Sequence, residues 1–415
     1  MKVLILAAGK GERLLPITEN CPKVLVPVLG RPLIEYIIDD LSKLGLKDLV
    51  VVVGHRSEQI KTHLGDGSKF GVKISYVHQE RLTGEAEAIL SAESALQGSD
   101  PFLVVDGDFV ADPGLIAGTM RLGLEKDADI TVALTRVQDP SHFGVVKLGT
   151  ESRIHDVVEK PPLNDAPSNL AVSSVYLFKS SLFEPLRKIR HLESAMSSMM
   201  KAGDKAYGLI WEDEWIDIGR PWDFLRANQF LMKRRFAINR SYTDPSATIS
   251  DCAKLEEPYF IGPDARVMDN ASVKGSYIDA GAKIGTNCLI RDFSYIGRRT
   301  VVGFSCEIKT SIVMDETAIG HLAYVGDSII GRRCEFGAGA ITANTRFDKG
   351  TVRMIIEGKE VDSGRIGLGA IVGDDAQIGV NASIYPGRKI GCRAWIKPGE
   401  VVVKNVPSQT STEVR

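Results

Sequence analysis

The C-terminal part of this 415-residue chain carries a period of six residues that few folds can accommodate. After about residue 240, aliphatic residues recur at every sixth position, and a small residue usually stands four places after each of them. Such hexapeptides are the signature of a parallel β-helix, in which three short strands make one coil and successive coils stack by strand pairing. The aliphatic and small side chains are predicted to fill its interior.

The register of the repeat can be followed along the sequence. The predicted inward positions are Ile249, Leu255, Ile261, Val267, Val273, Ile278, Ile284, Ile290, Ile296, Val302, Ile308, Val313, Ile319, Val325, Ile330, Phe336, Ile366, Val372, Ile378, Ile384, Ile390, Ile396 and Val402. Residues 343–365 interrupt the repeat and are predicted to form a projecting loop. Cys288, Cys306 and Cys334 fall at the small inward position, which predicts core packing rather than metal binding.

The N-terminal part has a different pattern. Residues 2–8, 48–54 and 101–108 are predicted strands, and residues 32–45 and 84–96 are predicted helices. This alternation predicts a parallel or mixed sheet covered by helices. The helix predicted at 221–236 is amphipathic and connects the two parts.

Charge and hydropathy exclude several classes of protein. The net charge is −2, so no basic field indicates a nucleic-acid partner. No apolar run approaches the length of a membrane-spanning helix, and the N-terminus lacks the features of a signal peptide. The six cysteines are scattered. We therefore expect a cytoplasmic protein without membrane or nucleic-acid partners.

The stretch from Leu4 to Val28 predicts a phosphate site. The first strand ends in Gly9 and Gly11, and Arg13 and Lys23 follow. Leu14 occupies the third glycine place of a dinucleotide fingerprint, and the Walker Gly-Lys-Ser/Thr is absent. The backbone N–H groups of such a loop can bind an anion whose charge the two cations neutralise. The alternative is an ordinary glycine turn between strand and helix.

Three other segments carry charged residues that suit the same site. Asp106 and Asp108 end an apolar strand, Glu159 adjoins Lys160, and Asp217 lies within an apolar and aromatic run. Ligands bind at the carboxyl ends of strands in open α/β sheets, and carboxylates there suit Mg²⁺. Each acid taken alone could be a cap, a surface ion pair or a satisfied buried group.

In combination, these motifs resemble a known family. Residues 1–230 resemble the sugar-1-phosphate nucleotidylyltransferases in four motifs, which are LAAGxGxRLxPxTxxxPKxLxPV, GD, EKP and WxDxGxPxD. With the hexapeptide repeats, HLAYVGDSIIG and FGAGAITAN, the chain resembles the bifunctional family that makes UDP-N-acetylglucosamine, in its archaeal form. The resemblance implies an α/β fold: a Rossmann-like nucleotidyltransferase domain with a mixed sheet, followed by a left-handed parallel β-helix.

The resemblance also implies a domain division and an assembly. We expect a nucleotidylyltransferase domain at residues 1–229, a linker at 230–239, an acetyltransferase β-helix at 240–405 and a tail at 406–415. Hexapeptide acyltransferases are usually trimers, so a homotrimer or a dimer of trimers is expected. The substrates would be UTP or dTTP, hexose 1-phosphates and acetyl-CoA, with Mg²⁺ as cofactor.

The resemblance assigns roles to residues of the first domain. It implies that Arg13 binds the leaving pyrophosphate, Lys23 binds phosphate near the reacting centre, and Asp108 and Asp217 hold Mg²⁺. The implied nucleotide contacts are Ala8, Gly9, Gly11, Gln79 and Gly84, and the implied sugar-phosphate contacts are Gly144, Glu159, Lys160 and Asn169. Gln79 favours a pyrimidine base. Glu85 and Ser174 depart from the family's usual threonine and glycine, which leaves the choice of nucleotide and sugar open.

The second domain receives its own set of residues. His321 stands two places after the inward Ile319, and the resemblance implies that it is the general base for acetylation of glucosamine 1-phosphate. The implied sugar-phosphate contacts are Lys309, Tyr324 and Asn344, and Ala338 is an implied coenzyme A contact. Lys349 and Arg353 of the projecting loop could meet phosphate.

Three other readings remain. The chain could be a glucose 1-phosphate thymidylyl- or uridylyltransferase whose β-helix serves only assembly. It could be a non-catalytic regulatory or assembly subunit, although such relatives would be expected to lose the phosphate loop or the metal acids. Mannose 1-phosphate guanylyl transfer is the third, and Gln79 disfavours it.

Overall fold

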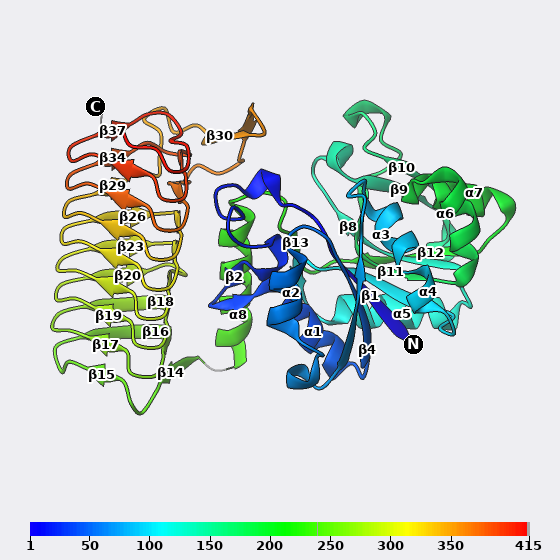
Figure 1. Ribbon diagram of the computed structural model, residues 1–415, viewed down its shortest axis with the longest axis horizontal. Coiled ribbons are helices and arrows are strands. Elements are labelled where there is room, and N and C mark those ends of the chain that lie inside the picture. Colours follow the sequence, from blue (N-terminus) through cyan, green and yellow to red (C-terminus); the bar gives the residue numbers. More distant parts are fainter. Residues whose placement is uncertain (239, 413–415) are drawn as a thin grey trace. The chain divides into compact units, whose positions relative to one another are not determined.

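In the computed structural model, which describes residues 1–238 and 240–412, the first predicted strand is β1, Lys2–Ala7, at the middle of a mixed sheet (Figure 1). β1 pairs in parallel with β4 and β6, whereas β11 runs antiparallel to β6. The strand order is β10-β9-β11-β6-β1-β4-β5, and β8 joins β12 to β11. The predicted mixed α/β sheet is confirmed.

The remaining elements of this part follow the alternation seen in the sequence. The strands are β4 Asp48–Val53, β5 Lys73–His78, β6 Phe102–Asp106, β7 Phe109–Ala111, β8 Ile130–Arg136, β9 Gly144–Leu148, β10 Ile154–Glu159, β11 Leu170–Phe178, β12 Ala206–Trp211 and β13 Trp215–Asp217. The helices are α1 Leu33–Lys43, α2 Ser57–Leu64, α3 Glu85–Ser91, α4 Glu93–Leu96, α5 Gly114–Glu125, α6 Phe183–Ile189 and α7 Leu192–Ala202. No helix in the described ranges is long and apolar enough to cross a membrane.

One predicted helix is divided in two. The pattern at 84–96 predicts a single helix, but the structure has α3 and α4, which meet at Ala92. The hydroxyl of Ser91 donates a hydrogen bond to the carbonyl of Glu87, four residues back, a contact that competes with the helical ladder and bends helices. The prediction of one continuous helix was therefore wrong.

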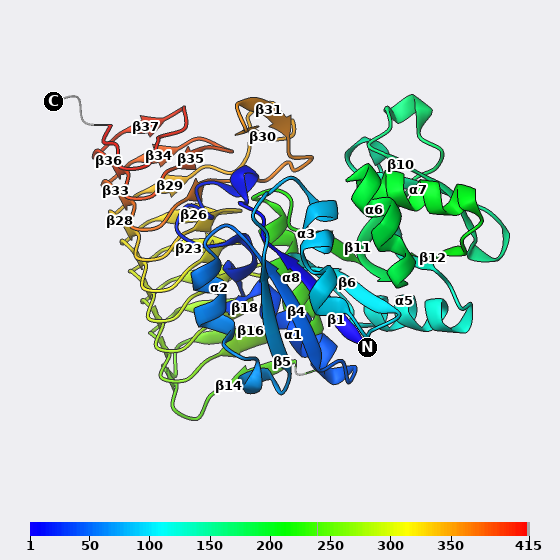
Figure 2. The ribbon, with the colours of Figure 1, turned by 45° about the vertical axis from the view of Figure 1, so that its right-hand side comes forward.

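The C-terminal strands form a parallel solenoid. Equivalent positions of successive coils pair with one another, as Ile284 does with Val302 and Val302 with Ile319, so one coil spans three hexapeptides. One sheet has eight strands; the other has fourteen and covers two faces, because β18 pairs with both β20 and β21 (Figure 2). The predicted parallel β-helix is confirmed.

The solenoid is built from short strands. Their bounds are β14 Ser241–Thr243, β15 Thr248–Ile249, β16 Lys254–Ile261, β17 Arg266–Val267, β18 Ser272–Ile278, β19 Lys283–Ile284, β20 Leu289–Arg291, β21 Tyr295–Ile296, β22 Val301–Val302, β23 Glu307–Lys309, β24 Ile312–Val313, β25 Ala318–Ile319, β26 Tyr324–Gly326, β27 Ile329–Ile330, β28 Glu335–Phe336, β29 Ile341–Thr342, β32 Ile371–Val372, β33 Gln377–Ile378, β34 Ser383–Ile384, β35 Lys389–Ile390, β36 Trp395–Ile396 and β37 Val401–Val402. Their inward side chains form one hydrophobic core, in which Cys288, Cys306 and Cys334 are buried as predicted.

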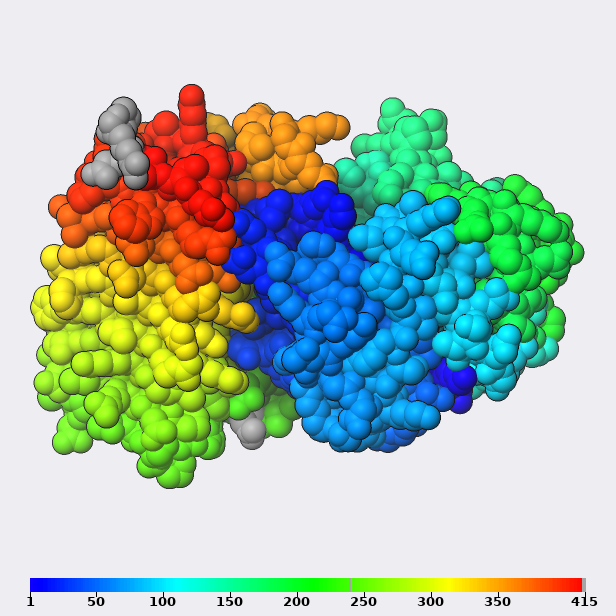
Figure 3. All heavy atoms as spheres, in the orientation of Figure 1, coloured from blue at the N-terminus to red at the C-terminus, as the bar shows by residue number. Residues whose placement is uncertain are grey.

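The interruption of the repeat contains a hairpin. Strands β30, Arg353–Ile356, and β31, Lys359–Asp362, pair antiparallel, and the segment stands out from the solenoid surface, orange in Figure 3. The predicted return of the repeat at Ile366 was wrong, because that side chain is 58% exposed. The first inward aliphatic residue after the hairpin in this register is Val372, which pairs with Ile330 of the coil before the interruption.

The chain divides into two compact units that do not follow the sequence order strictly. The first contains residues 1–10, 22–25 and 32–217; the second contains 11–21, 26–31 and 218 onward, including α8, Asp223–Ile238. Gly30 shows why its segment belongs to the second unit: a Cβ there would lie 2.4 Å from the Tyr295 hydroxyl. Asn239 of the predicted linker and residues 413–415 of the predicted tail lie outside the described residues.

We expect a fragment of residues 240–415 to be soluble, rich in β-structure by circular dichroism, and oligomeric by light scattering. Its hydrophobic core is drawn entirely from residues after 240, so removing the first sheet leaves that core intact. The fragment does lose the cover of residues 11–21 and 26–31 and of α8. An unfolded monomer would show that this cover, or a different boundary, is required for folding.

Candidate functional site

The loop after β1 is open to an anion. A Cβ at Gly9 would meet no atom within 4 Å, and Gly11 has a φ of 70°, the left-handed region that favours glycine. The carbonyl of Gly11 accepts hydrogen bonds from the Leu14 amide and the Thr18 hydroxyl, which fix the turn. Arg13 is exposed and makes no ion pair with any described residue, so its guanidinium remains available for a ligand.

Two predicted metal ligands and a predicted cation lie together. Lys23 forms an ion pair with Asp108, and both side chains are largely shielded from solvent. Asp217 pairs with Phe109 in the antiparallel β7–β13 ladder, which places it beside Asp108. Two carboxylates at a strand end, open to phosphate oxygens, suit Mg²⁺. Within the described ranges no cluster of three or more acidic, histidine or cysteine side chains could hold a metal ion, so substrate would have to supply further ligands.

The predicted base-reading segment is held by its own amide. Gln79 is buried, and its side-chain nitrogen donates to the carbonyls of Arg81, at 2.9 Å, and Gly84, at 3.1 Å. Both donor hydrogens are thus used within the loop, which leaves the amide oxygen as an acceptor for a ring N–H of a base. Gly84 has a φ of 120° and open space where a Cβ would stand.

The predicted sugar-binding residues meet across β9 and β10. Gly144 pairs with Glu159 in the ladder, and Lys160 forms an ion pair with Glu159. A Cβ at Gly144 would lie 3.3 Å from Glu159 Oε2 and 3.4 Å from Glu193 Oε1. Asn169 is not part of this group. It precedes β11, in which Ala171 pairs with Val145 of β9, so Asn169 lies further along β9, on the side away from Gly144. Its exposed side chain hydrogen-bonds no described residue.

Sequence reasoning named Asp106 as a strand-end acid of the site and Glu85 as a departure from the family's usual residue, but it did not single out Tyr176 or Glu193. Burial raises the pKa of the Tyr176 hydroxyl well above its usual range, and the charges of Glu85, Asp106 and Glu193 raise it further. Burial first, and then Glu85 and Asp108, raise the pKa of Asp106, against a hydrogen bond with Ser174. Ser174 has a φ of 51° at a bulge in β11. The departures at Glu85 and Ser174 were the only sequence signals of this arrangement.

In the solenoid, the predicted sugar-phosphate contacts surround one buried acid. Asn344 donates a hydrogen bond to Asp327 at 2.5 Å, and the Lys309 ammonium lies 3.5 Å from the same carboxylate. The Tyr324 hydroxyl donates to the Asn344 side-chain oxygen at 3.4 Å. Arg365 approaches Asp327 from the far side of the interruption, at 3.8 Å. Asp327 and Arg365 were not predicted.

His321 lies in the turn between β25 and β26, outside the hydrophobic core, and the residue is exposed. The backbone N–H of Phe304, one coil earlier, donates to His321 Nδ1 at 2.8 Å. In the neutral ring this leaves the proton on Nε2. To accept a proton at Nε2, the ring must give up the contact with Phe304. The carbonyl of His321 bonds to the amide of Gly339, beside the predicted coenzyme A contact Ala338.

Comparison with known proteins finds matches to both halves of the chain. The nucleotidyl transferase family matches residues 2–234, and the GMPPB C-terminal domain matches residues 273–365. The bifunctional protein GlmU of Methanocaldococcus jannaschii is 35% identical over 385 residues, 91% of this chain and 88% of its own. A bifunctional sugar-1-phosphate nucleotidylyltransferase/acetyltransferase of Sulfurisphaera tokodaii is 35% identical over 387 residues, 90% of each chain.

The chain belongs to the bifunctional sugar-1-phosphate nucleotidylyltransferase/acetyltransferase family. Solved structures resemble its nucleotidyltransferase part. A putative glucose-1-phosphate thymidylyltransferase from Bacillus anthracis has a TM-score of 0.51 and 27% identity, covering 59% of this chain and 98% of that protein. A UDP-glucose pyrophosphorylase complexed with UDP-glucose has a TM-score of 0.50 and 29% identity, covering 56% and 99%. The protein is therefore a nucleotidyltransferase.

The projecting loop carries two cations, Lys349 and Arg353, that were predicted as possible phosphate contacts. Arg353 pairs with Glu360 across the hairpin at 3.2 Å. Lys349 makes no ion pair among the described residues, and its backbone φ of 59° places it in a tight turn. Phosphate binding by either residue stays a prediction.

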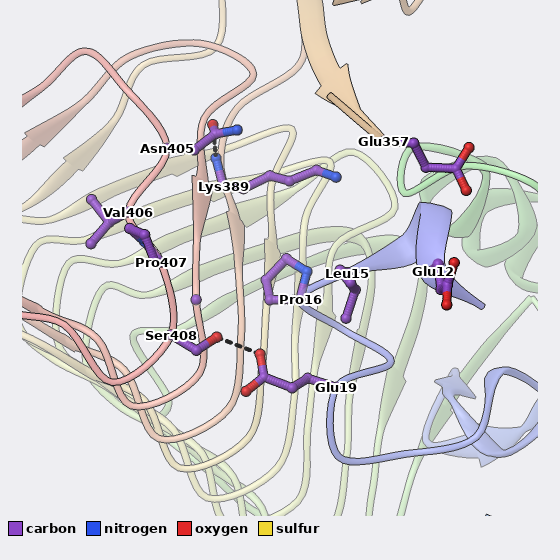
Figure 4. A pocket seen from close by; sticks show the side chains of 11 residues that line it. Glu12, Leu15, Pro16, Glu19, Glu357, Lys389, Asn405, Val406, Pro407 and Ser408 are labelled. Carbon is purple, nitrogen blue, oxygen red and sulfur yellow. Dashed lines mark hydrogen bonds between the residues drawn. The ribbon is translucent and has the colours of Figure 1, made fainter. Parts of the chain in front are cut away.

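A separate pocket of about 660 Å³ lies within the second unit (Figure 4). Residues 12–19, which follow the phosphate loop, form one wall, and the last coils and Glu357 form the other. The Ser408 hydroxyl donates to Glu19, and Lys389 points into the pocket. Burial lowers the pKa of Lys389 to about 8, which the charge of Glu357 opposes. No predicted site residue lines this pocket.

We expect Asp327→Ala to lower the free energy of unfolding of the solenoid by about 2 kcal/mol, because it leaves the buried amide of Asn344 and two cations without their acceptor. Asp375→Ala is the matched control: its ion pair with Arg333 is half exposed, and such pairs contribute about 0–1 kcal/mol. Denaturant unfolding followed by circular dichroism measures both. Equal losses would contradict the central role of Asp327.

Proposed function

We propose that the two halves catalyse consecutive steps toward UDP-N-acetylglucosamine. The solenoid transfers an acetyl group from acetyl-CoA to glucosamine 1-phosphate, and the α/β half transfers a uridylyl group from UTP to the N-acetylated product. The observation that carries the first-half assignment is the meeting of Lys23, Asp108 and Asp217 at the carboxyl end of the central strands. Phosphoryl transfer needs charge neutralisation and positioning, which this group offers.

In the uridylyl transfer, an oxygen of the sugar phosphate attacks the α-phosphorus, the bond to the bridging oxygen breaks, and pyrophosphate leaves. Mg²⁺, held by Asp108 and Asp217, supplies neutralisation of the phosphate charge when bound. Lys23 binds phosphate near the reacting centre, and the unpaired Arg13 binds the leaving pyrophosphate. Lys160 binds the sugar phosphate, and Glu159 accepts a hydrogen bond from a sugar hydroxyl.

The base is recognised by the Gln79 loop. With both amide hydrogens donated to Arg81 and Gly84, Gln79 offers an oxygen to the N3–H of uracil. Thymine presents the same N–H, so dTTP is a second substrate of this loop. The glycine at position 84 leaves room for the base to approach the backbone.

In the acetyl transfer, the sugar amine attacks the thioester carbonyl carbon, the C–S bond breaks, and the amine loses a proton. His321 takes that proton after its ring leaves the amide of Phe304. Lys309, Tyr324 and Asn344, held by Asp327, bind the sugar phosphate. Acetyl-CoA binds beside Ala338, and a second copy of the chain, in a trimer, covers the exposed face that carries His321.

A product matrix tests the proposal. UTP, dTTP, GTP and ATP are each combined with glucose, mannose, glucosamine and N-acetylglucosamine 1-phosphates, with and without acetyl-CoA. We expect UDP-N-acetylglucosamine from UTP and glucosamine 1-phosphate only when acetyl-CoA is present. Exclusive use of glucose 1-phosphate without acetyl-CoA turnover would favour an assembly role for the solenoid, and exclusive use of GTP would overturn the reading of Gln79.

A further inference from the structure

One row of solenoid residues is apolar until it reaches the pocket of Figure 4. The row stands beside the inward positions, on the face where Arg235 Cζ of α8 lies 4.2 Å from the centre of the Phe260 ring. Its members pair from coil to coil, and the buried ones are Phe260, Tyr277, Tyr295, Ile312, Ile329 and Ile371. The residue that pairs with Ile371 in the next coil is Lys389. The row thus changes from apolar to cationic where it meets the pocket, and shielding such a charge from water is costly unless another group answers it.

The protein does not supply that group. The Lys389 ammonium forms no ion pair or hydrogen bond with any described residue, and its side chain is half-buried. Figure 4 shows the amine pointing into the pocket, whose volume is about 660 Å³. Glu357 lies on the opposite wall and does not reach the amine closely enough for an ion pair. The ammonium therefore offers its hydrogen-bond donors to the pocket itself.

A second donor stands beside Lys389. The bridge between Ile390 and Val406 continues the row by one coil and places Asn405 next to Lys389. The side-chain oxygen of Asn405 accepts the backbone N–H of Lys389 at 2.9 Å, which fixes the orientation of the amide. The NH₂ group of the same amide donates to no described residue. One wall of the pocket therefore carries an ammonium and an amide NH₂ group, and both lack acceptors.

The rest of the lining decides which kind of acceptor fits. Apolar side chains make up part of both walls, and they are Leu15, Pro16, Val406 and Pro407. Three acids also line the pocket, Glu12, Glu19 and Glu357, and the Ser408 hydroxyl donates to Glu19. Because these carboxylates outnumber the one cation, a multiply charged phosphate would be repelled. A single negative charge beside Lys389, attached to an apolar body, matches the lining.

We propose that this pocket is a second ligand site, which binds a monocarboxylate with an apolar body. The carboxylate accepts charge-assisted hydrogen bonds from Lys389 and a hydrogen bond from Asn405. The body packs against Leu15 and Pro16, which removes apolar surface from water. A cavity of this size is within the range of small-molecule sites. The ligand would hold residues 12–19, which follow the phosphate loop, against the last coils.

The test is a calorimetric titration of the full-length protein at pH 7 with three probes. They are 4-phenylbutanoate, the neutral 4-phenylbutan-1-ol, which has the same body, and inorganic phosphate. We expect the carboxylate to bind about tenfold more tightly than the alcohol, the effect of one charge-assisted hydrogen bond. Inorganic phosphate should not compete with it. Equal binding of carboxylate and alcohol, tighter binding of phosphate, or no binding of the carboxylate would each overturn the proposal.

Lys389→Met removes the ammonium and keeps an unbranched side chain at the end of the apolar row. The variant should lose the preference for the carboxylate, and its unfolding temperature should not fall, because no ion pair is broken. Lys404→Met is the matched control: it removes the same charge from an exposed position next to Asn405 and outside the pocket lining. Its preference should equal that of the wild type. A preference that survives in Lys389→Met would place the carboxylate elsewhere and overturn the assignment.

A pH series provides an independent readout of the ammonium. Burial lowers the pKa of Lys389 to about 8, which the charge of Glu357 opposes, so the amine loses its proton as the pH rises through that value. The other titratable groups that line the pocket are the acids Glu12 and Glu19. Affinity for 4-phenylbutanoate should fall about tenfold between pH 7 and about pH 9.5. Lys389→Arg stays charged and should bind equally at both. A wild-type affinity that does not change with pH would contradict binding through Lys389.

Discussion

Asp108→Ala is expected to lower NDP-sugar formation at least about 100-fold, which corresponds to about 3 kcal/mol of transition-state stabilisation. The change removes one of two carboxylates proposed for Mg²⁺ and releases Lys23 from its ion pair. Pyrophosphate release from UTP and a sugar 1-phosphate measures the loss. Calorimetric titration of Mg²⁺ with UTP present should show weaker binding, which separates a metal ligand from a residue that only positions Lys23.

Two further variants sharpen this prediction. Asp108→Asn keeps an oxygen that can accept from Lys23 but loses the charge, and should be impaired almost as severely. Asp66→Ala removes an acid that caps an exposed turn, and should leave the rate near that of the wild type. Acetyl transfer should persist in all three proteins, because the solenoid core is separate. Wild-type turnover of Asp108→Asn with Mg²⁺ would refute the assignment of this carboxylate to the metal.

His321→Ala is expected to remove most acetyl-CoA consumption with glucosamine 1-phosphate, since a positioned base contributes about 10²–10⁴-fold. Among the described residues, the ring of this exposed residue accepts one hydrogen bond, from the amide of Phe304, so its loss should disturb the fold little. Thiol release measures acetyl transfer. Uridylyl transfer to N-acetylglucosamine 1-phosphate, measured in the same preparation, is the internal control and should be unchanged.

His321→Gln decides between two roles for this ring. In the conformation described, Nε2 carries the proton and could donate a hydrogen bond to the thioester oxygen; after the ring reorients, it could accept a proton instead. Glutamine can donate but cannot act as a base at neutral pH. Activity as low as in His321→Ala supports the base. Substantial recovery would identify His321 as a donor, and wild-type activity of His321→Ala would assign catalysis elsewhere.

The solenoid could be predicted almost residue by residue, because its pattern is local and periodic. Each inward position from Ile261 to Phe336 is buried as the period of six requires. The prediction was wrong at Ile366, where the hairpin ends and no repeat constrains the register. Within the α/β half, the phosphate loop and the Lys23, Asp108 and Asp217 motifs were likewise visible, because each is a short run of characteristic residues.

Tertiary structure alone decided which residues share a site. Asp217 reaches Asp108 through a ladder between strands more than a hundred residues apart, and Glu193 joins Glu159 because α7 packs against the β9–β10 edge. Asp327 became the centre of its network only when stacking brought Asn344 from the next coil. Residues 11–21 pack with the last coils, where Cys392 Sγ lies 3.5 Å from the carbonyl oxygen of Pro16. Such contacts depend on chain folding over long separations, which no local pattern encodes, whereas the repeat fixes its own geometry within eighteen residues.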